Sequence, residues 1–363
     1  MPELFVGLMS GTSLDGIDAV LADFGGATPR LVSADHGRLA PALRNQLLAL
    51  QFPSPNELHV AALAGNQLAH AYAESVKRLE QSAGVDASHV RAVGCHGQTI
   101  RHQPDAGYTI QLVNGALLAE LTAIDVVCDF RSRDIAAGGQ GAPLVPSFHE
   151  AVFGSVTAHR AIVNIGGLAN ITDLPAAGPV SGFDCGPGNV LMDAWIARHL
   201  GVAYDEGGRW ASNGELDSGL LQRLLAHGFF ARRPPKSTGR ETFNLGWLDS
   251  LLSGTEDPAD VQRTLLALTA RSIADAIASH CPGTREIYLC GGGARNAALS
   301  REITALLPSR KVSTTDSLGI AAEHVEAFAF AWLARRCLAG KPGNLPTVTG
   351  ARGARVLGTL YPA

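Results

Sequence analysis

The sequence predicts an α/β fold in two domains. Strands and amphipathic helices alternate along the chain, and two similar hairpins with glycine turns lie roughly one domain length apart. The chain has 363 residues, of which 46% are hydrophobic, enough to fill two cores. We expect a first domain of residues 1–143 plus about 321–363 and a second of about 144–320, with a central cleft between them.

The first hairpin lies near the start of the sequence. An apolar strand, Leu4–Met9, runs into a turn of Gly, Ser, Thr and Asp, and an alternating strand, 17–24, follows at once. Backbone N–H groups of such a turn can form an anion site, and carboxylates can hold Mg²⁺ through water. A plain surface hairpin is the alternative, but two more glycine-rich turns follow. The candidate phosphate-binding residues are Ser10, Gly11, Thr12, Ser13, Leu14, Asp15, Gly16, Ile17 and Asp18, with Asp15 and Asp18 nearest the metal ion.

Two later turns have a similar character. Residues 161–165 and 168–172 form a hairpin around Gly166-Gly167, and the strand Glu286–Cys290 runs into a triple glycine before a helical stretch. Such a triple glycine lets a flat ring or a phosphate lie against backbone at a helix N-terminus. No G-x-x-x-x-G-K-[ST] sequence occurs, so this is not a P-loop. The three turns predict a nucleotide cleft between two related domains, with further contacts from Asn164, Gly166, Gly167, Asn170, Gly291, Gly292 and Gly293.

The remaining elements follow from periodicity. Apolar residues on one face of 57–82 predict an amphipathic helix, and short β-branched runs predict strands. The further expected strands are 31–34, Val90–Cys95, Tyr108–Leu112 and 124–128. The further expected helices are 42–50, 117–121, Val190–Leu200, 216–226, 261–279, Ala297–Leu306 and 321–338. The last of these helices should return to the first domain, and the crossing into the second domain should lie at 143–146.

Composition excludes some classes of partner. A net charge near −4 leaves no basic stripe for nucleic acid. The six cysteines show no C-x-x-C pair or metal spacing and mostly sit in or beside apolar runs, which is typical of reduced thiols. The N-terminus has no basic leader before an apolar core, and no run of 18 apolar residues occurs. We therefore expect a cytoplasmic protein that binds neither nucleic acid nor membrane.

The chemistry is assigned to Asp184. Residues 182–189 read Gly-Phe-Asp-Cys-Gly-Pro-Gly-Asn, and we expect them to end a strand and open a helix. A carboxylate there would stand at the mouth of the cleft, where the glycines clear room for a substrate. The alternative is an N-capping aspartate, but the glycines and the proline delay the helix beyond normal capping distance.

Seven segments, in order, resemble those of the anhydro-N-acetylmuramic acid kinase family, part of the actin/hexokinase/Hsp70-like ATPase superfamily. Each segment alone is a weak signal, but together they are specific and span essentially the whole chain. The resemblance implies a two-domain actin-like (ribonuclease H-like) ATPase fold with a central interdomain cleft. The segments are 7–18, 95–102, 129–134 with 138–143, 164–170, 183–189, 236–241 and 291–296.

The resemblance also implies an activity. The family uses ATP to open the 1,6-anhydro ring of 1,6-anhydro-N-acetylmuramic acid and to phosphorylate O6, giving N-acetylmuramic acid 6-phosphate and ADP in peptidoglycan recycling and amino-sugar degradation. Asp184 would be the general base for the attacking water. ATP and Mg²⁺ are the implied cofactors, and a homodimer the implied assembly. A conventional sugar or acyl kinase and a nucleotide-switched binding protein are the alternatives, separated by the reducing-sugar product and by sugar-dependent ADP release.

The implied substrate carries a lactyl carboxylate, which suits the bidentate fork of an arginine. Arg131 and Arg133 are the candidates in the sequence 129–134, and we favour Arg131. The alternative for at least one of them is a structural ion-pair cluster with Asp129 and Asp134.

Other residues are given substrate roles by their position. Gln98 should contact sugar hydroxyls, because His96 and His102 have no third residue at a spacing suited to a metal. Glu326 should reach the sugar amide or hydroxyls, although a solvent-facing helix glutamate is nearly as plausible. For 236–241, a loop over the nucleotide and a subunit contact are equally plausible.

Overall fold

The computed structural model describes residues 2–11, 14 and 16–363. Contacts between Cα atoms divide the chain into one unit of Met1–Val152 with His324–Ala363 and a second of Phe153–Glu323. Helix α5, Val145–Phe153, lies in the first unit except for its last residue. The chain therefore leaves the first unit at the end of α5, later than the expected crossing at 143–146.

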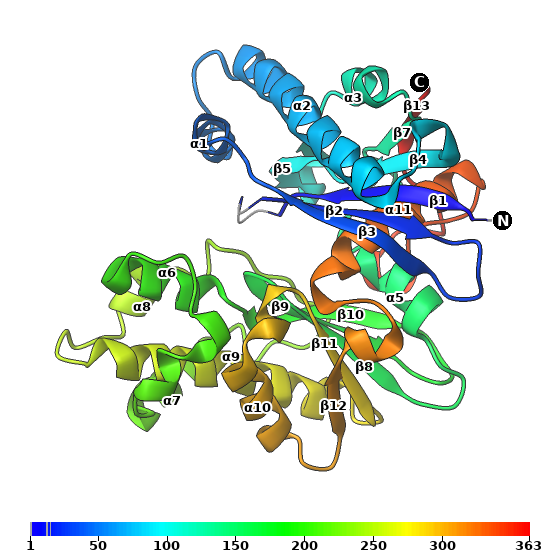
Figure 1. The fold of residues 1–363 in the computed structure, drawn as a ribbon. Helices are drawn as coiled ribbons and strands as arrows, with labels where there is room; N and C mark the ends of the chain where they lie inside the picture. The colour runs from blue at the N-terminus through cyan, green and yellow to red at the C-terminus, as the bar shows by residue number, and fades with distance from the viewer. Residues whose placement is uncertain (1, 12–13, 15) are drawn as a thin grey trace. The chain divides into compact units, whose positions relative to one another are not determined.

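A mixed sheet with the order β13-β7-β4-β1-β2-β3 forms the centre of the first unit (Figure 1). Strands β1, β2 and β3 form an antiparallel meander, and β4 and β7 continue the sheet in parallel to β1. The C-terminal strand β13 closes one edge antiparallel to β7. The bounds are β1 Leu4–Met9, β2 Ile17–Asp23, β3 Arg30–Gly37, β4 Val90–Cys95, β7 Val126–Cys128 and β13 Thr359–Tyr361.

Helices cover both faces of this sheet. Because side chains alternate along a strand, Val6 and Leu8 of β1 face one side, where they share a core with Leu68 and Tyr72 of α2. Gly7 faces the other side, and a Cβ there would collide with the carbonyl oxygen of Ala327 in α11. The elements around the sheet are α1 Pro41–Ala49, α2 Glu57–Ala83, β5 Gln98–Gln103, β6 Tyr108–Leu112, α3 Gly115–Thr122, α4 Ser132–Ala136, α11 Val325–Leu338 and α12 Pro346–Thr349.

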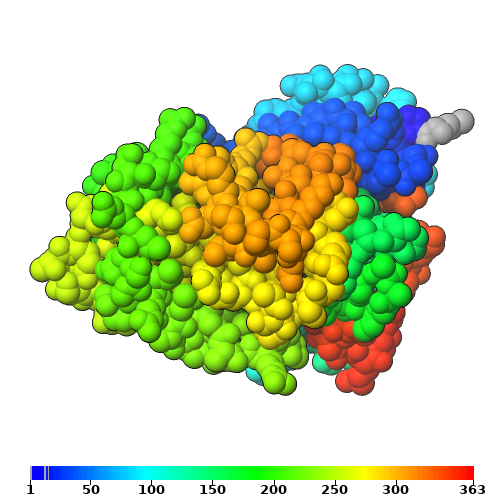
Figure 2. Space-filling view, turned by 90° about the horizontal axis from the view of Figure 1, so that it is seen from below, coloured from blue at the N-terminus to red at the C-terminus, as the bar shows by residue number. Residues whose placement is uncertain are grey.

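The second unit repeats the sheet topology. Its order β10-β9-β8-β11-β12 has the same antiparallel meander and the same parallel continuation as β3-β2-β1-β4-β7. The space-filling view shows the segments of this unit, coloured from green to orange, packed side by side (Figure 2). The bounds are β8 Arg160–Ile165, β9 Leu168–Leu174, β10 Ser181–Pro187, α6 Val190–Leu200, α7 Ser218–Leu225, α8 Leu245–Asp249, α9 Pro258–His280, β11 Glu286–Cys290, α10 Ala297–Leu306 and β12 Lys311–Thr314. The repeated α/β unit agrees with the expected two-domain actin-like fold class.

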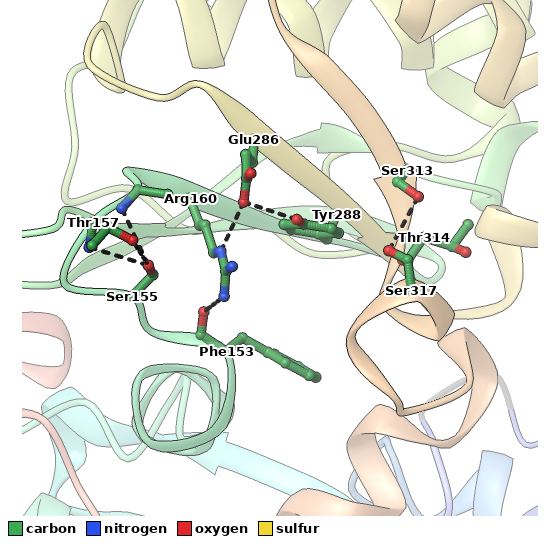
Figure 3. Close-up of polar contacts among 10 residues, drawn as sticks. Phe153, Ser155, Thr157, Arg160, Glu286, Tyr288, Ser313, Thr314 and Ser317 are labelled. Atoms are coloured by element: carbon green, nitrogen blue, oxygen red, sulfur yellow. Dashed lines mark hydrogen bonds and ion pairs between the residues drawn. The ribbon is translucent and has the colours of Figure 1, made fainter. Parts of the chain in front are cut away.

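A polar network fixes the register at the start of β8 and β11. Arg160 lies opposite Glu286, and its Nε is 2.9 Å from Glu286 Oε2 (Figure 3). The Tyr288 hydroxyl donates to the same oxygen at 2.8 Å, and Arg160 Nη1 donates to the carbonyl of Phe153 at 2.9 Å. These bonds lie at the opposite end of the strands from the glycine turns, so they hold the strands in place without occupying that end.

The structure corrects some local expectations. The run 182–189 ends strand β10, Ser181–Pro187, and leads into α6 as expected, whereas β5, β12, β13 and α5 were not expected. The last long helix begins at Val325, because a short 3₁₀ turn, Ala322–His324, occupies the residues before it. None of the helices in the described residues combines the length and the apolar character that crossing a membrane requires.

Candidate active site

In the second unit, three of the expected site residues form a row across the sheet. Asp184 of β10 lies opposite Asn170 of β9, and Asn170 lies opposite Asn164 of β8. Directly opposed residues on neighbouring strands project from the same face of a sheet. The sheet therefore places the carboxylate of β10 side by side with the two amides of the β8–β9 hairpin.

A β-bulge follows Asp184. The pairing with β9 shifts between Asp184 and Gly186, so that Cys185 is the extra residue. Gly186 has φ of +153°, and a Cβ there would lie 2.8 Å from the Phe230 ring. Bulges re-aim side chains and are frequent beside active sites. The N-cap interpretation of Asp184 is wrong, because the residue lies within β10 and α6 starts only at Val190.

The segment around Lys236 runs along β10, which is an edge strand. The main-chain N–H of Asp184 donates to the carbonyl of Lys236 at 3.0 Å. The N–H of Thr238 donates to Asp184 Oδ2 at 2.9 Å. The 236–241 segment therefore makes its contact with the aspartate itself, a position that neither of the sequence-based expectations for it had foreseen.

Burial raises the pKa of Asp184 to about 6, and the Thr238 N–H and the charge of Lys236 only partly oppose this rise. A carboxylate with that pKa exchanges a proton near neutral pH, as a general base must. Lys236 is itself held by the Phe229 ring, with Nζ 4.6 Å from the ring centroid. Burial lowers the pKa of Lys236.

The turn between β8 and β9 supports the start of α6. The Gly166 carbonyl accepts from the N–H of Asn189 at 2.8 Å. The Gly167 carbonyl accepts from Gly188 and Val190 at 2.9 and 3.0 Å. These bonds satisfy amides that the first turn of a helix otherwise leaves without a partner. The two glycines thus support the segment that follows the Asp184 strand.

The triple glycine after β11 divides into packed and open positions. A Cβ on Gly291 would collide with Asn164 Oδ1, and one on Gly293 would collide with the side chain of Ile165. Gly291 also has φ of +79°, which favours glycine. A Cβ on Gly292 would meet no atom within 4 Å. Packing therefore explains two of the glycines, and Gly292 is the one where another molecule has room to approach.

In the first unit, the C-terminal ends of three parallel strands bring further expected residues together. Ser10 and Gly11 follow β1, Gln98 comes just after β4, and Arg131 follows β7. Gln98 Nε2 donates to the Gly11 carbonyl at 3.2 Å. Ser10 is fully buried, and its hydroxyl is 2.7 Å from the Tyr72 hydroxyl. The side chain of Ser10 is thus part of the protein interior, which leaves its main chain for any ligand.

Arg131 contacts a histidine to which the sequence had given no binding role. Its Nε and Nη2 lie 3.3 and 2.9 Å from His96 Nε2, and its Nη1 donates to the Gly141 carbonyl at 2.8 Å. Burial, followed by the charge of Arg131, lowers the pKa of His96 to about 3. His96 is therefore neutral and accepts through Nε2. Its position two residues before Gln98, directly after a buried strand, was the available signal.

Electrostatics link Glu326 to the same group. Burial lowers the pKa of Arg131 to about 10, and the charges of Glu326 and Asp134 oppose this. Two buried atoms here, His96 Nδ1 and Gln98 Oε1, have no hydrogen-bond partner among the described residues. Three expected substrate residues, Gln98, Arg131 and Glu326, therefore belong to one region of the first unit.

The proposed ion-pair cluster at 129–134 is wrong. Arg133 is exposed, whereas Asp134 is fully buried. The Asp134 carboxylate accepts from Asn344 Nδ2 at 2.6 Å, from Thr349 Oγ1 at 2.8 Å and from the Gly141 N–H at 2.8 Å. The hydrogen-bond partners of Asp134 in the described part of the chain are uncharged, so it anchors the C-terminal segment.

The expected metal carboxylates are only partly described. Asp18 Oδ1 is 2.8 Å from His36 Nδ1, and both side chains are about half exposed. The expected residues Thr12, Ser13 and Asp15 lie outside the described residues. Leu14 and Ile17 are buried in the core, so only their main chains are open to a phosphate. Within the described ranges, no three His, Cys, Asp or Glu residues group as a metal site would require.

Comparisons with known proteins give one family. The model of the family "Anhydro-N-acetylmuramic acid kinase" matches residues 3–363. A relative of that name from Nitrosospira multiformis is 59% identical over 361 residues, which is 99% of each chain. One from Thiobacillus denitrificans is 58% identical over 365 residues, covering 99% of this chain and 98% of its own.

A solved structure with weaker similarity is a ROK family glucokinase from Streptomyces griseus in complex with glucose and AMPPNP. It covers 92% of this chain and 99% of its own, at 14% identity and a TM-score of 0.42, which is too low to support an inference. The whole-length match to the family model and the two close relatives decide the assignment. The chain belongs to the anhydro-N-acetylmuramic acid kinase family and is a kinase.

Proposed function

We propose that this chain uses ATP to open the 1,6-anhydro ring of 1,6-anhydro-N-acetylmuramic acid and to phosphorylate O6, giving N-acetylmuramic acid 6-phosphate and ADP in peptidoglycan recycling. Membership of the family supports the substrate and the reaction class. The observation that supports the hydrolytic half of the reaction is the burial of Asp184, which raises its pKa to about 6. That value suits a base acting near neutral pH.

In the proposed reaction, Asp184 removes a proton from a water molecule as the water oxygen bonds to the anomeric carbon. The bond between that carbon and O6 breaks, and O6 keeps the electron pair. O6 then attacks the γ-phosphorus of ATP, ADP leaves, and Asp184 later returns its proton to solvent. An ordinary glycosidase needs a second carboxyl group to protonate the leaving oxygen. Here phosphorus captures that oxygen, so no such acid is required.

For the nucleotide, we propose that main-chain groups of 10–18 and the turns at Gly166 and Gly292 contact the phosphates or the base. Gly292 supports this role because a Cβ there would have no neighbour within 4 Å. Asp18 suits a water-mediated contact with Mg²⁺, since its carboxylate is about half exposed. Mg²⁺ would neutralise charge on the transferring phosphates.

For the sugar, we propose that Arg131 binds the lactyl carboxylate. Its pKa of about 10 keeps it charged at neutral pH, and His96 fixes its Nε and Nη2. We propose that Gln98 contacts a sugar hydroxyl. Its buried Oε1, which has no partner among the described residues, supports this contact. Glu326 is proposed to contact the sugar amide or hydroxyls.

We further infer a cytoplasmic homodimer. The six cysteines are free thiols, and five of them are buried, which fits a reducing compartment. The dimer follows only from the family resemblance. Sedimentation velocity at several protein concentrations would check it, and a monomer at every concentration would contradict it.

The test is Asp184→Asn, which keeps the side-chain shape and removes the basicity. We expect ring opening and phosphorylation to fall together by about 10² to 10⁴. ADP release and the reducing-sugar product are measured with the anhydro sugar, with N-acetylmuramic acid and simple hexoses as comparison substrates. Asp316→Asn, an exposed carboxylate of the same unit, is the matched control. Near-normal turnover of Asp184→Asn would end the proposed mechanism.

A further inference from the structure

We propose that the side-chain hydroxyl of Thr238 binds the attacking water together with Asp184. This inference rests on the proposed function of Asp184 as the base. Thr238 is 54 residues from Asp184 in the sequence, and only the folding of its segment against β10 brings the two together. Thr238 would then be a second residue, beside Asp184, that touches the attacking water.

Two facts support this role of the hydroxyl. The Thr238 nitrogen is 2.9 Å from Asp184 Oδ2. The hydroxyl oxygen of a threonine is joined to its own nitrogen through only two carbon atoms, so Oγ1 is held close to the carboxylate. That oxygen is buried and has no hydrogen-bond partner among the described residues. Leaving a buried hydroxyl unpaired destabilises the fold, so such a group calls for an explanation.

The segment that carries Thr238 is well supported. On one side, Lys236 bonds to Asp184 through its carbonyl and rests on the Phe229 ring. On the other side, Phe243 is fully buried, and its N–H donates to the Gly239 carbonyl at 3.3 Å. The Phe243 ring packs against Phe229 with centroids 5.6 Å apart. The same aromatic cluster therefore anchors both ends of the segment.

Phe230 connects this aromatic cluster with β10, the strand that carries Asp184. Its ring lies 5.7 Å from the Phe243 ring, between centroids, and 2.8 Å from the position a Cβ would take on Gly186. Phe230 therefore lies next to both Phe243, which follows the segment, and the bulge that follows Asp184. Thr238 and Asp184 are held in a fixed relation, as a pair that binds one small molecule requires.

The two groups divide the hydrogens of the water. One hydrogen points to Asp184 and leaves as a proton when the oxygen attacks. The second points to Thr238 Oγ1 and stays on the new hydroxyl of the sugar. With both hydrogens directed, a lone pair of the water is left to face the anomeric carbon, which lowers the entropic part of the barrier. Thr238 neither gains nor loses a proton.

The experiment compares Thr238→Val with Thr238→Ser. Valine keeps the shape of threonine and the main-chain N–H that bonds to Asp184, but it lacks the hydroxyl. We expect turnover of the anhydro sugar to fall about 10- to 100-fold, the effect of losing one positioning hydrogen bond. The KM for ATP should not change. Serine keeps the hydroxyl and should restore turnover to within a few-fold of the wild type.

The melting temperature of Thr238→Val should not fall together with its turnover. Because valine removes an unpaired buried hydroxyl, the melting temperature of Thr238→Val should stay equal or rise while turnover falls. The apparent pKa near 6 in the pH–rate profile should remain, since the carboxylate keeps its surroundings. Ser237→Ala, an exposed neighbour in the same segment, is the matched control and should resemble the wild type.

The outcomes separate this inference from the proposed function. Normal turnover of Thr238→Val beside an inactive Asp184→Asn would overturn the inference and leave the base in place. Near-normal turnover of Asp184→Asn would overturn the base itself, whatever the threonine variants do. Equal losses of turnover in the valine and serine variants, with lowered melting temperatures, would show that Thr238 acts by packing and would also overturn the inference.

Discussion

In the first unit, Arg131 is bound by the neutral ring of His96 and by the Gly141 carbonyl, while in the second unit the Asp184 carboxylate is held by one N–H from Thr238. Burial disfavours the charged form of both. It lowers the pKa of Arg131 only to about 10, but it raises that of Asp184 to about 6. The same physical effect thus leaves a permanent charge in one unit and a titratable group in the other. A permanent charge suits binding, and a titratable group suits proton transfer.

Among the further tests of this comparison, removing the permanent charge has the largest expected effect. Arg131→Met should lower kcat/KM for the anhydromuramic substrate about 100-fold, because a charge-assisted bidentate contact is lost. With 1,6-anhydro-N-acetylglucosamine, which lacks the lactyl group, the change should be only a few-fold. Arg133→Met, an exposed neighbour, is the control. Equal losses with both sugars would remove Arg131 from the carboxylate site.

The second prediction uses the titratable group. Turnover should fall about tenfold per pH unit below a pKa of about 6, because only the ionised form of Asp184 accepts a proton. The KM for the sugar should change little over the same range, since Arg131 keeps its charge. A pH–rate profile of the wild type measures both quantities. A turnover that stays flat down to about pH 5 would contradict the comparison.

Stability should respond to the same ionisation. The folded-state pKa of Asp184, about 6, lies above its ordinary value of 3.8, so the folded protein binds more protons than the unfolded chain between these values. The protonated carboxyl therefore favours the fold at low pH, and this contribution is lost as pH rises from about 4 through about 6. Urea unfolding should show this loss in the wild type and not in Asp184→Asn. Parallel curves for the two proteins would argue against the raised pKa.

A smaller effect is expected when Arg131 keeps its charge but loses its support. His96→Phe preserves a ring against Phe330, whose centroid lies 4.8 Å from that of His96, and removes the acceptor Nε2. We expect the KM for the sugar to rise up to about tenfold and stability to fall by about 1–3 kcal/mol. The kcat and the KM for ATP should stay near the wild-type values. A fall in kcat at constant KM would assign His96 to the chemistry instead.

The smallest expected effect tests the open space at Gly292, in the turn that follows β11. Gly292→Ala should leave the melting temperature unchanged and raise the KM for ATP a few-fold, since the new methyl group meets only the ligand. Gly293→Ala is the matched variant. Its methyl group would collide with Ile165, so the loss there should be one of stability. If Gly292→Ala altered neither quantity, this turn would not contact the nucleotide.

These sites differ in how far the sequence predicts them. Asp184 and Arg131 stand in short segments that resemble those of the family, so the sequence could propose roles for them, and these roles stay predictions. Their partners could not be assigned, because His96 is 35 residues from Arg131 and Thr238 is 54 residues from Asp184. Such pairs depend on strand order and on the path of a loop, which no local pattern encodes.

The local errors have physical causes too. Glycine and proline are poor strand formers, so the sequence around Asp184 did not show that the strand runs on to Pro187. An edge strand with a bulge tolerates them, and β10 is such a strand. Ser10 shows another contact that the local pattern did not reveal. A hydroxyl in a glycine turn suggested a ligand contact, yet the turn directs it inward to Tyr72.

The close approach of α11 to β1 and β4 has a consequence for synthesis of the chain. Gly7 and Gly94 let the main chain of this helix lie directly against the strands, and Arg335 of the helix pairs with Glu3, 332 residues earlier. A ribosome makes β1 first and α11 near the end, so one face of the first sheet stays uncovered during most of translation. The second unit is one continuous stretch of the chain, so its sheet can be covered as soon as that stretch is made. We therefore expect the nascent chain to complete its second unit before its first, the reverse of the usual order.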